Sequence, residues 1–198
     1  MTTSKIKQRI IGKGRGAIFA PLDFLDIGSR ASVDQALSRL ADQGVIRRLT
    51  RGLYDYPKKS PRFGYLSPSA GDIAKAVARK DNQVLQPSPA MAANQLGLST
   101  QVPSKPTYMT DGPTRTKTVG RQVIQFRNAS SKTLVGAGQK TGAVFQALRY
   151  VGKDRVDEQV IGKLARSLDD KDRVMLSKQS KHVPAWMHPV VQQIVAHA

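Results

Sequence analysis

The chain has 198 residues and a formal net charge of +18, from 32 Lys and Arg against 14 Asp and Glu. Because length divided by roughly 150 is a soft guide to domain number, we expect two small domains. The sequence contains no cysteine, which excludes disulfides and thiolate metal sites, and no apolar run of about 18 residues, which argues against a membrane span.

The positive charge is spread along the whole sequence. Residues 1–60 carry twelve Lys and Arg against five Asp, residues 61–135 ten against three, and residues 136–198 ten against six. Such an excess favours a polyanionic partner, above all nucleic acid; the alternative is a surface that only keeps the protein in solution. The first 16 residues are basic but lack the apolar stretch of a signal peptide, so we expect a cytoplasmic protein without membrane attachment.

The first 57 residues have the element order of a winged helix-turn-helix. SKIKQRII places Ile6 and Ile10 on one face of a helix, GKGRG breaks it, AIF favours a brief extended segment, and Pro21 opens a second helix in PLDFLDIG. The next helix, up to a left-handed stop at Gly44, has apolar residues at helical spacing. VIRRLT and LYDY, joined by a turn that contains Gly52, predict a hairpin that forms the wing.

The start of the third helix is ambiguous, and this affects one candidate DNA contact. Ser29 can cap the helix, but Ser32 with Gln35 three residues later also fits a capping box. Gln35 is therefore either a capping side chain or a base contact.

A winged helix predicts where DNA binds. The recognition helix presents its N-terminal and outer residues to base edges in the major groove, while flanking cations hold phosphates or enter the minor groove. We expect Arg30, Gln35 and Arg39 to face the groove, since Arg suits guanine and Gln suits adenine. Arg39 is alternatively a phosphate contact or an ordinary surface residue, and the arginines of the hairpin alternatively keep the strand edge soluble. The complete predicted DNA-binding set is Arg15, Ser29, Arg30, Ser32, Gln35, Arg39, Arg47, Arg48 and Arg51.

Several segments resemble a known bacterial family. GKGRGAIFAPLDFLDIGSRASVDQALSRLADQGVIRRLTRGLYDYP is similar to the N-terminal domain of AbiEi-type antitoxins. SPSAGDIAKAVARK, AANQLGLSTQVP and YMTDGPTRT resemble the following domain of a family of unknown function grouped with those antitoxins, so the resemblance covers residues 5 to about 150. It implies an antitoxin of a type IV toxin-antitoxin system. In such a protein the winged helix is a transcriptional repressor of its own operon, bound at inverted repeats, and the second domain neutralises a nucleotidyltransferase-like toxin.

The second half predicts an α+β domain. PKKSPRFGYLSPS is rich in Pro, Ser and basic residues and predicts a linker over residues 58–68, which separates a domain at 1–57 from one at 69–198. In the second domain GDIAKAVARK and AMAANQLGL predict helices, and TYMT, RTKTV and RQVIQF predict a small antiparallel meander. Four helical segments follow, and Asp169 is placed to cap the third. We thus expect an α+β chain: a winged helix-turn-helix, then a mixed domain with a helical C-terminal part.

The predicted meander carries a secondary basic surface. It is a candidate for further DNA contact or for an acidic partner, with solvated charge as the alternative. Its residues are Arg115, Lys117, Arg121 and Arg127.

No motif predicts catalysis, a metal or a cofactor. GAGQKTG resembles a phosphate-binding loop, but Gln139 and Leu134 occupy two positions where that motif needs Gly. We therefore expect a regulator rather than an enzyme. The alternatives are a structural protein that binds RNA or DNA without base selection, or a nucleic-acid enzyme that uses Asp111 or Asp157. The sequence does not decide between a monomer and a dimer on DNA.

Overall fold

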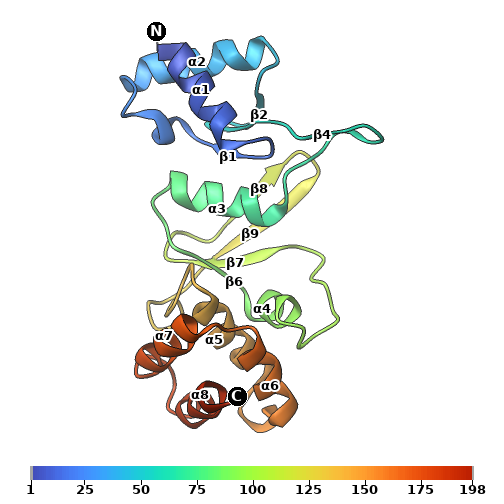
Figure 1. Ribbon diagram of the computed structural model, residues 1–198, viewed down its shortest axis with the longest axis vertical. Helices are drawn as coiled ribbons and strands as arrows, with labels where there is room; N and C mark the ends of the chain where they lie inside the picture. The colour runs from blue at the N-terminus through green and yellow to red at the C-terminus, as the bar shows by residue number, and fades with distance from the viewer. Residues whose placement is uncertain (1, 198) are drawn as a thin grey trace. The chain divides into compact units, whose positions relative to one another are not determined.

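The structure, a computed structural model, describes residues 2–197 of a mixed α+β protein (Figure 1). The chain forms two compact units: an N-terminal unit of Met1–Asn82 with Thr118–Gln122, and a C-terminal unit of Gln83–Lys117 with Val123–Ala198. Within the described residues, no helix is both long and apolar enough to cross a bilayer. The α+β class predicted from the sequence is confirmed.

The N-terminal unit begins with the predicted order of elements. A three-stranded antiparallel sheet has the order β1-β3-β2, with Ile18 opposite Asp55 and Arg48 opposite Tyr54. The β2–β3 hairpin, which the sequence predicts as the wing, lies at one side of this sheet, and we refer to it below as the wing. The elements are α1 (Thr2–Lys13), β1 (Ile18–Phe19), the 3-10 helix η1 (Pro21–Phe24), α2 (Arg30–Asp42), β2 (Arg47–Thr50) and β3 (Leu53–Asp55).

Helices α1 and α2 pack through the residues that the helical spacing predicts. Ile6 and Ile10 of α1 are fully buried, and the ring of Phe19 meets Phe24 edge-on at 5.6 Å and stacks on Tyr54 at 6.5 Å between ring centroids. The apolar positions of α2 complete this core: Val33, Ala36, Leu37 and Leu40. Burying this face forces the polar residues of α2 outward.

The ends of α2 are settled by its caps. The Ser29 hydroxyl accepts a hydrogen bond from the backbone N–H of Ser32, so Ser29 is the N-cap. Gly44 follows the helix with a φ of 68°, a left-handed conformation that suits glycine.

The helix expected in PLDFLDIG is only the four-residue η1. The backbone N–H of Ala20 donates to the Asp23 carboxylate at 2.9 Å, which holds a tight turn. Leu22 and Leu25 are exposed, so a longer helix has no apolar face to bury.

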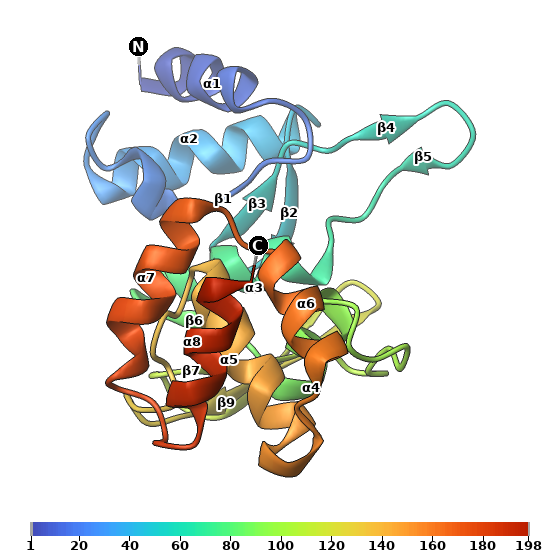
Figure 2. The same ribbon diagram turned by 60° about the horizontal axis from the view of Figure 1, so that its bottom comes forward.

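The segment 58–68, expected as a linker, contains a hairpin of β4 (Lys59–Ser60) and β5 (Gly64–Tyr65). Figure 2 shows this hairpin extending away from the three-stranded sheet of its unit. The backbone N–H groups of Arg62 and Phe63 both donate to the Ser60 hydroxyl at 3.3 Å, which orders the turn. Pro61 and Pro68 make this hairpin difficult to predict from the sequence, because proline disfavours regular strands.

Helix α3 (Ala70–Lys80) belongs to the N-terminal unit, not to the second domain as the sequence-based boundary at residues 57–69 has it. Arg79 donates to the Asp23 carboxylate at 3.0 and 3.1 Å and to the carbonyl of Ile18 at 3.0 Å. Lys80 donates to the carbonyl of Arg51 at 3.2 Å. These contacts join residues far apart in the sequence, so the local pattern of residue types does not predict them.

The C-terminal unit combines a mixed sheet with a group of helices. Strand β7 pairs antiparallel with β6 and parallel with β9, giving the order β6-β7-β9-β8. The elements from residue 83 onward are β6 (Leu85–Pro87), α4 (Pro89–Gln95), β7 (Thr107–Thr110), β8 (Arg115–Val119), β9 (Gln122–Asn128), α5 (Lys140–Val151), η2 (Lys153–Arg155), α6 (Glu158–Arg166), α7 (Asp170–Ser180) and α8 (Met187–Ala196). The residues around the β8–β9 turn, Thr118–Gln122, belong to the N-terminal unit.

The meander order expected for this sheet is wrong, although its three strands were correctly located. Strand β9 buries Ile124 and Phe126, whereas the middle of β8 is exposed, so the more apolar strand takes the inner position beside β7. The helical C-terminal part is confirmed, and Asp169 caps α7 as predicted: its carboxylate accepts from the N–H of Asp172 at 2.8 Å. That backbone hydrogen bond holds the pKa of Asp169 below its usual value.

Candidate nucleic-acid interface

Helix α2 turns its polar face to solvent. Arg30, Gln35 and Arg39, the three residues expected to face the DNA groove, are all exposed on the side opposite the buried apolar residues. The surface predicted from the sequence is therefore available for binding.

An ion pair holds the Arg30 side chain. Its Nε donates to the Asp34 carboxylate at 2.9 Å, one helical turn away. This contact uses only Nε and leaves the two terminal amino groups for the two acceptors that guanine presents in the major groove. Asp34 thus orients the guanidinium without occupying its forked end.

The cap contacts of α2 bear on the two roles expected for the Gln35 side chain, a cap or a base contact. Because Ser29 caps α2, the alternative in which Gln35 serves a capping box loses its basis. The Ser32 hydroxyl donates to the carbonyl of Ser29 at 2.8 Å, so both serines are engaged in the first turn. Gln35 is exposed in the next turn, where an amide can pair with adenine.

The outward face of α2 is nearly neutral. Arg30 and Arg39 are matched by Asp34 and Asp42, which are also exposed. With no net charge on this face, α2 attracts phosphates only weakly. Its polar side chains are therefore better suited to contacting bases than to contacting the DNA backbone.

The wing has two exposed arginines and one that is engaged inside the unit. The Arg48 guanidinium lies 5.4 Å from the centre of the Tyr54 ring, and Arg51 is exposed at the hairpin turn. Arg47 instead donates to both oxygens of Asp55, at 3.1 and 2.6 Å, and to the carbonyl of Leu66 at 2.9 Å. Because Asp55 is 1% exposed, Arg47 neutralises a buried carboxylate, a role that the sequence did not reveal.

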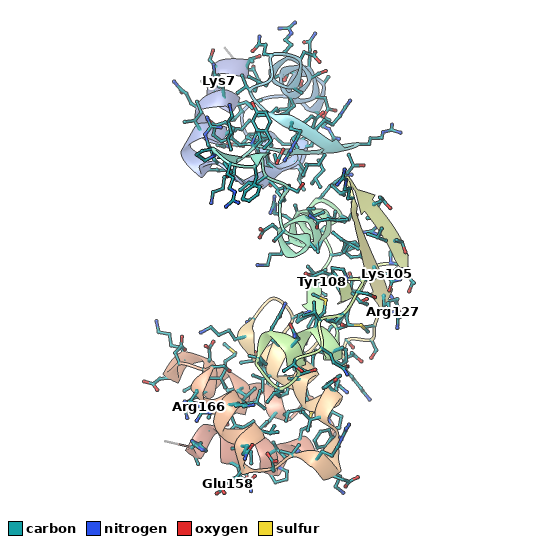
Figure 3. The ribbon with its side chains drawn as sticks, turned by 90° about the vertical axis from the view of Figure 1, so that its right-hand side faces the viewer. Lys7, Lys105, Tyr108, Arg127, Glu158 and Arg166 are labelled. Atoms are coloured by element: carbon teal, nitrogen blue, oxygen red, sulfur yellow. The ribbon has the colours of Figure 1, made fainter. Side chains whose placement is uncertain are left out.

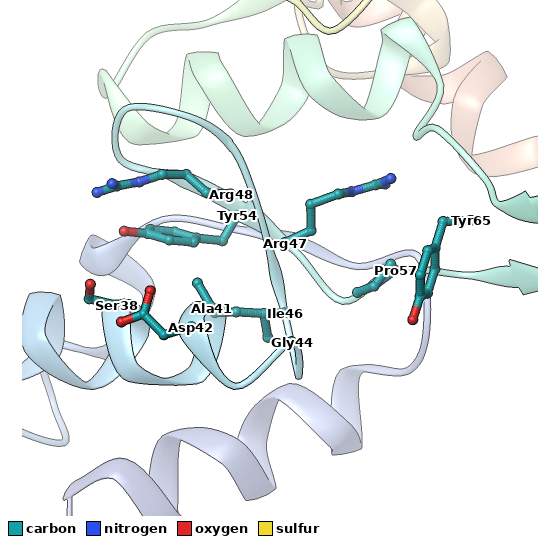
Figure 4. A pocket seen from close by; sticks show the side chains of 10 residues that line it. All are labelled: Ser38, Ala41, Asp42, Gly44, Ile46, Arg47, Arg48, Tyr54, Pro57 and Tyr65. Atoms are coloured by element: carbon teal, nitrogen blue, oxygen red, sulfur yellow. The ribbon is translucent and has the colours of Figure 1, made fainter.

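A cleft of about 400 Å³ lies between α2 and the wing (Figure 4). Ser38 and Asp42 of α2 line one side, Arg48 lies along the Tyr54 ring on the other, and Tyr65 of the β4–β5 hairpin lies on the side of Arg47. The recognition-helix candidate, the wing and the β4–β5 hairpin therefore border one hollow.

Arg15, the remaining predicted contact, lies in the turn after α1. Its guanidinium is 4.7 Å from the centre of the Tyr56 ring and donates to the carbonyl of Pro57 at 3.1 Å. Arg15 thus fastens this turn to the strand end, but its side chain is exposed and keeps its charge at the surface.

The β4–β5 hairpin is a basic and aromatic surface that sequence reasoning missed. Phe63 is 71% and Tyr65 59% exposed, and each ring has a cation beside it: Arg62 at 5.3 Å from Phe63 and Lys59 at 5.8 Å from Tyr65. The signal was present in KKSPRFGY, because no acidic residue lies between Asp55 and Asp72. Exposed aromatic side chains flanked by cations are typical of surfaces that contact bases and phosphates.

The secondary basic residues are divided between the two units. Lys117 and Arg127 are exposed in the C-terminal unit, and Figure 3 shows Arg127 on strand β9. Arg121 is exposed in the β8–β9 turn, which belongs to the N-terminal unit. Arg115 is half-buried, donates to Gln83 at 2.8 Å and lies 5.4 Å from the Phe126 ring.

Within residues 2–197 no three His, Asp or Glu side chains lie close enough together to hold a metal ion.

A comparison with protein families matches residues 5–176 to DUF6088, a family of unknown function. The chain belongs to the DUF6088 family. The matched range includes the whole N-terminal unit from Lys5 onward and runs into α7 of the C-terminal unit. A comparison with curated proteins finds no match. Membership of DUF6088 thus groups both units in one family without assigning either a function.

Proposed function

We propose that this DUF6088 protein is a sequence-specific duplex DNA-binding regulator that acts through its N-terminal unit. The observation that carries the proposal is α2: a capped helix whose exposed, nearly neutral face presents Arg30 and Gln35, beside a wing with exposed Arg48 and Arg51. Base selection belongs to the helix, and salt-dependent phosphate contact to the wing and the β4–β5 hairpin.

The resemblance to AbiEi-type antitoxins extends the proposal. On that basis the protein represses its own operon from inverted repeats and neutralises a nucleotidyltransferase-like toxin with its C-terminal unit. It functions in the cytoplasm without enzymatic activity of its own.

DNA titration with the full chain tests the regulator. We expect binding to the chain's own promoter about a thousandfold tighter than to random duplex at physiological salt. Equal binding to any duplex would instead favour a structural protein that coats nucleic acid through charge alone.

Two substitutions separate base selection from phosphate contact. Arg30→Ala should weaken promoter binding and relax the preference at one base pair, a loss of about 1 to 3 kcal/mol in discrimination. Arg48→Ala should weaken binding to all duplexes and lower the slope of log affinity against log salt by about one. Identical effects of both changes would show that α2 is not the recognition helix.

The antitoxin function has a separate test. We expect a nucleotidyltransferase-like reading frame beside this gene, whose product alone arrests growth and whose effect is relieved by co-expression of the full chain. An Arg30→Ala variant should still relieve the arrest, since toxin neutralisation is assigned to the C-terminal unit. Failure of the full chain to relieve arrest would remove the antitoxin function and leave DNA binding unaffected.

A further inference from the structure

The C-terminal unit contains a basic cleft that the proposed DNA contact does not use. The cleft has a volume of about 620 Å³, within the range of roughly 300 to 1,000 Å³ typical of small-molecule sites. The loop between β9 and α5, the last turn of α5 and the loop between α7 and α8 form it. Its lining residues are Ser131, Lys132, Thr133, Val135, Arg149, Lys181, His182, Val183 and Pro184.

The lining is positively charged and contains no carboxylate. Lys132 and Lys181 come from opposite loops and are exposed, and His182 lies beside Lys181. Ser131 and Thr133 add hydroxyl groups. Positive groups from separate segments thus meet in one hollow, although their mutual repulsion is unfavourable unless an anion offsets it.

Arg149, in the last turn of α5, is the central observation. Its side chain is half-buried, and no carboxylate among residues 2–197 forms an ion pair with it; burial alone lowers its pKa. One terminal amino group donates to the carbonyl of Lys132 at 3.2 Å, while its buried Nε has no hydrogen-bond partner among the described residues. A cation partly removed from water without a counter-charge is costly, and a bound anion would offset that cost.

Hydrogen bonds and buried side chains within the unit hold both walls of the cleft in place. The Gln146 side chain donates to the carbonyl of Thr133 at 2.7 Å, and Leu134 is buried behind that loop. On the opposite wall the backbone N–H of Val183 donates to the carbonyl of Ser180 at 3.2 Å, and Val183 is buried. A site fixed in advance loses little conformational entropy on binding.

We propose that this cleft binds a phosphate-bearing ligand through Lys132, Arg149 and Lys181. Three cationic side chains match the two or more negative charges of a phosphoryl group better than the single charge of a carboxylate. The Ser131 hydroxyl donates to a remaining phosphate oxygen. The Thr133 hydroxyl, which lies 3.2 Å from the Ser130 hydroxyl, donates to another while it accepts from Ser130. The phosphate comes either from a free small molecule, whose terminal phosphoryl group carries about two negative charges, or from successive phosphodiesters of a nucleic-acid backbone, which carry one charge each; both present phosphate oxygens to the cleft.

Calorimetric titration of the full chain with inorganic pyrophosphate, at about 150 mM salt, tests the site. We expect saturable binding with a Kd of about 1 mM or tighter. The double variant Lys132→Gln, Lys181→Gln changes only exposed side chains and should weaken binding about twentyfold. The matched double variant Lys153→Gln, Lys171→Gln removes two exposed lysines outside the cleft and should change it less than about twofold.

Two results would overturn the proposal: no saturation up to about 20 mM pyrophosphate, or equal weakening by both double variants. Competition then identifies the source of the phosphate. Displacement of pyrophosphate by ATP but not by a random duplex assigns the site to a free nucleotide-like ligand, and displacement by the duplex assigns it to the nucleic-acid backbone. Because the variants lie in the C-terminal unit, loss of this site leaves the promoter titration as an independent test of the regulator.

Discussion

Arg47 and Asp55 show how a single pairing decides the role of a charge. The Asp55 carboxylate is buried on β3 and accepts two hydrogen bonds from Arg47 on the neighbouring strand. The hydrogen bond from the Arg47 side chain to Asp55 raises the pKa of Arg47 above its ordinary value. Arg48, the next residue, points to the other face of the strand and remains exposed. Adjacent arginines therefore differ: Arg47 is engaged within the unit, and Arg48 is the one that the proposed function assigns to DNA.

Arg47→Met should destabilise the N-terminal unit by about 2 to 3 kcal/mol, because it leaves a buried carboxylate without its counter-charge. This value is below the usual range for a fully buried pair because the Arg47 side chain is 34% exposed. Hydrogen exchange of the β3 amides measures the change. The control Arg48→Gln, on the same strand, should alter stability by less than about 0.5 kcal/mol. Equal protection of β3 in both variants would contradict a structural role for Arg47.

At the scale of elements, the sequence predicts well where one face of a helix must be buried. Helix α2 has apolar residues at helical spacing and both caps, so its position and its exposed face could be predicted. Asp169 at the start of α7 is a similar local signal. In these cases the information lies within a few neighbouring residues.

The sequence fails where an element depends on distant partners. The β4–β5 hairpin escapes prediction for another reason: local hydrogen bonds to the Ser60 hydroxyl hold its turn, and its two-residue strands are too short to show an alternation of apolar and polar residues. The place of β9 beside β7 follows from the burial of Phe126 in the assembled sheet. The assignment of α3 depends on Arg79 reaching Asp23, 56 positions earlier. The engagement of Arg47 with Asp55 likewise depends on strand register, which side-chain pattern alone does not fix.

The β4–β5 hairpin makes a prediction as an element. Phe63→Ala should weaken duplex binding about tenfold, because an exposed aromatic ring at a basic turn can wedge between base pairs or pack against the sugar edge of the groove. Fluorescence anisotropy with the promoter duplex measures the loss. Ile11→Ala, which removes a side chain 49% exposed on α1, is the control and should bind as the unsubstituted protein does. Unchanged affinity of Phe63→Ala would assign the exposed ring to a contact other than DNA.

At the scale of the whole molecule, both units are basic. The N-terminal unit has seventeen Lys and Arg against seven Asp, a net charge of +10, and the C-terminal unit has fifteen against seven acidic residues, a net charge of +8. Four arginines of the N-terminal unit are engaged with its own aspartates, through the pairs Arg9–Asp26, Arg30–Asp34, Arg47–Asp55 and Arg79–Asp23. The proposed function therefore assigns phosphate contact to other cations of that unit, among them Arg48 and Lys59.

The proposed DNA binding makes a prediction about the salt dependence of affinity, which differs between the two units. Replacing both Arg48 and Lys59 with Gln should reduce the slope of log affinity against log salt by about two, since each phosphate contact contributes about 0.9. Replacing Lys117 and Arg127, two exposed cations of the C-terminal unit, with Gln should leave the slope unchanged. Both pairs remove the same charge, so a difference between them cannot come from net charge. An equal fall in slope for both pairs would instead show that cations of both units contact DNA phosphates. The exposed cations of the C-terminal unit would then bind DNA rather than a separate anionic partner.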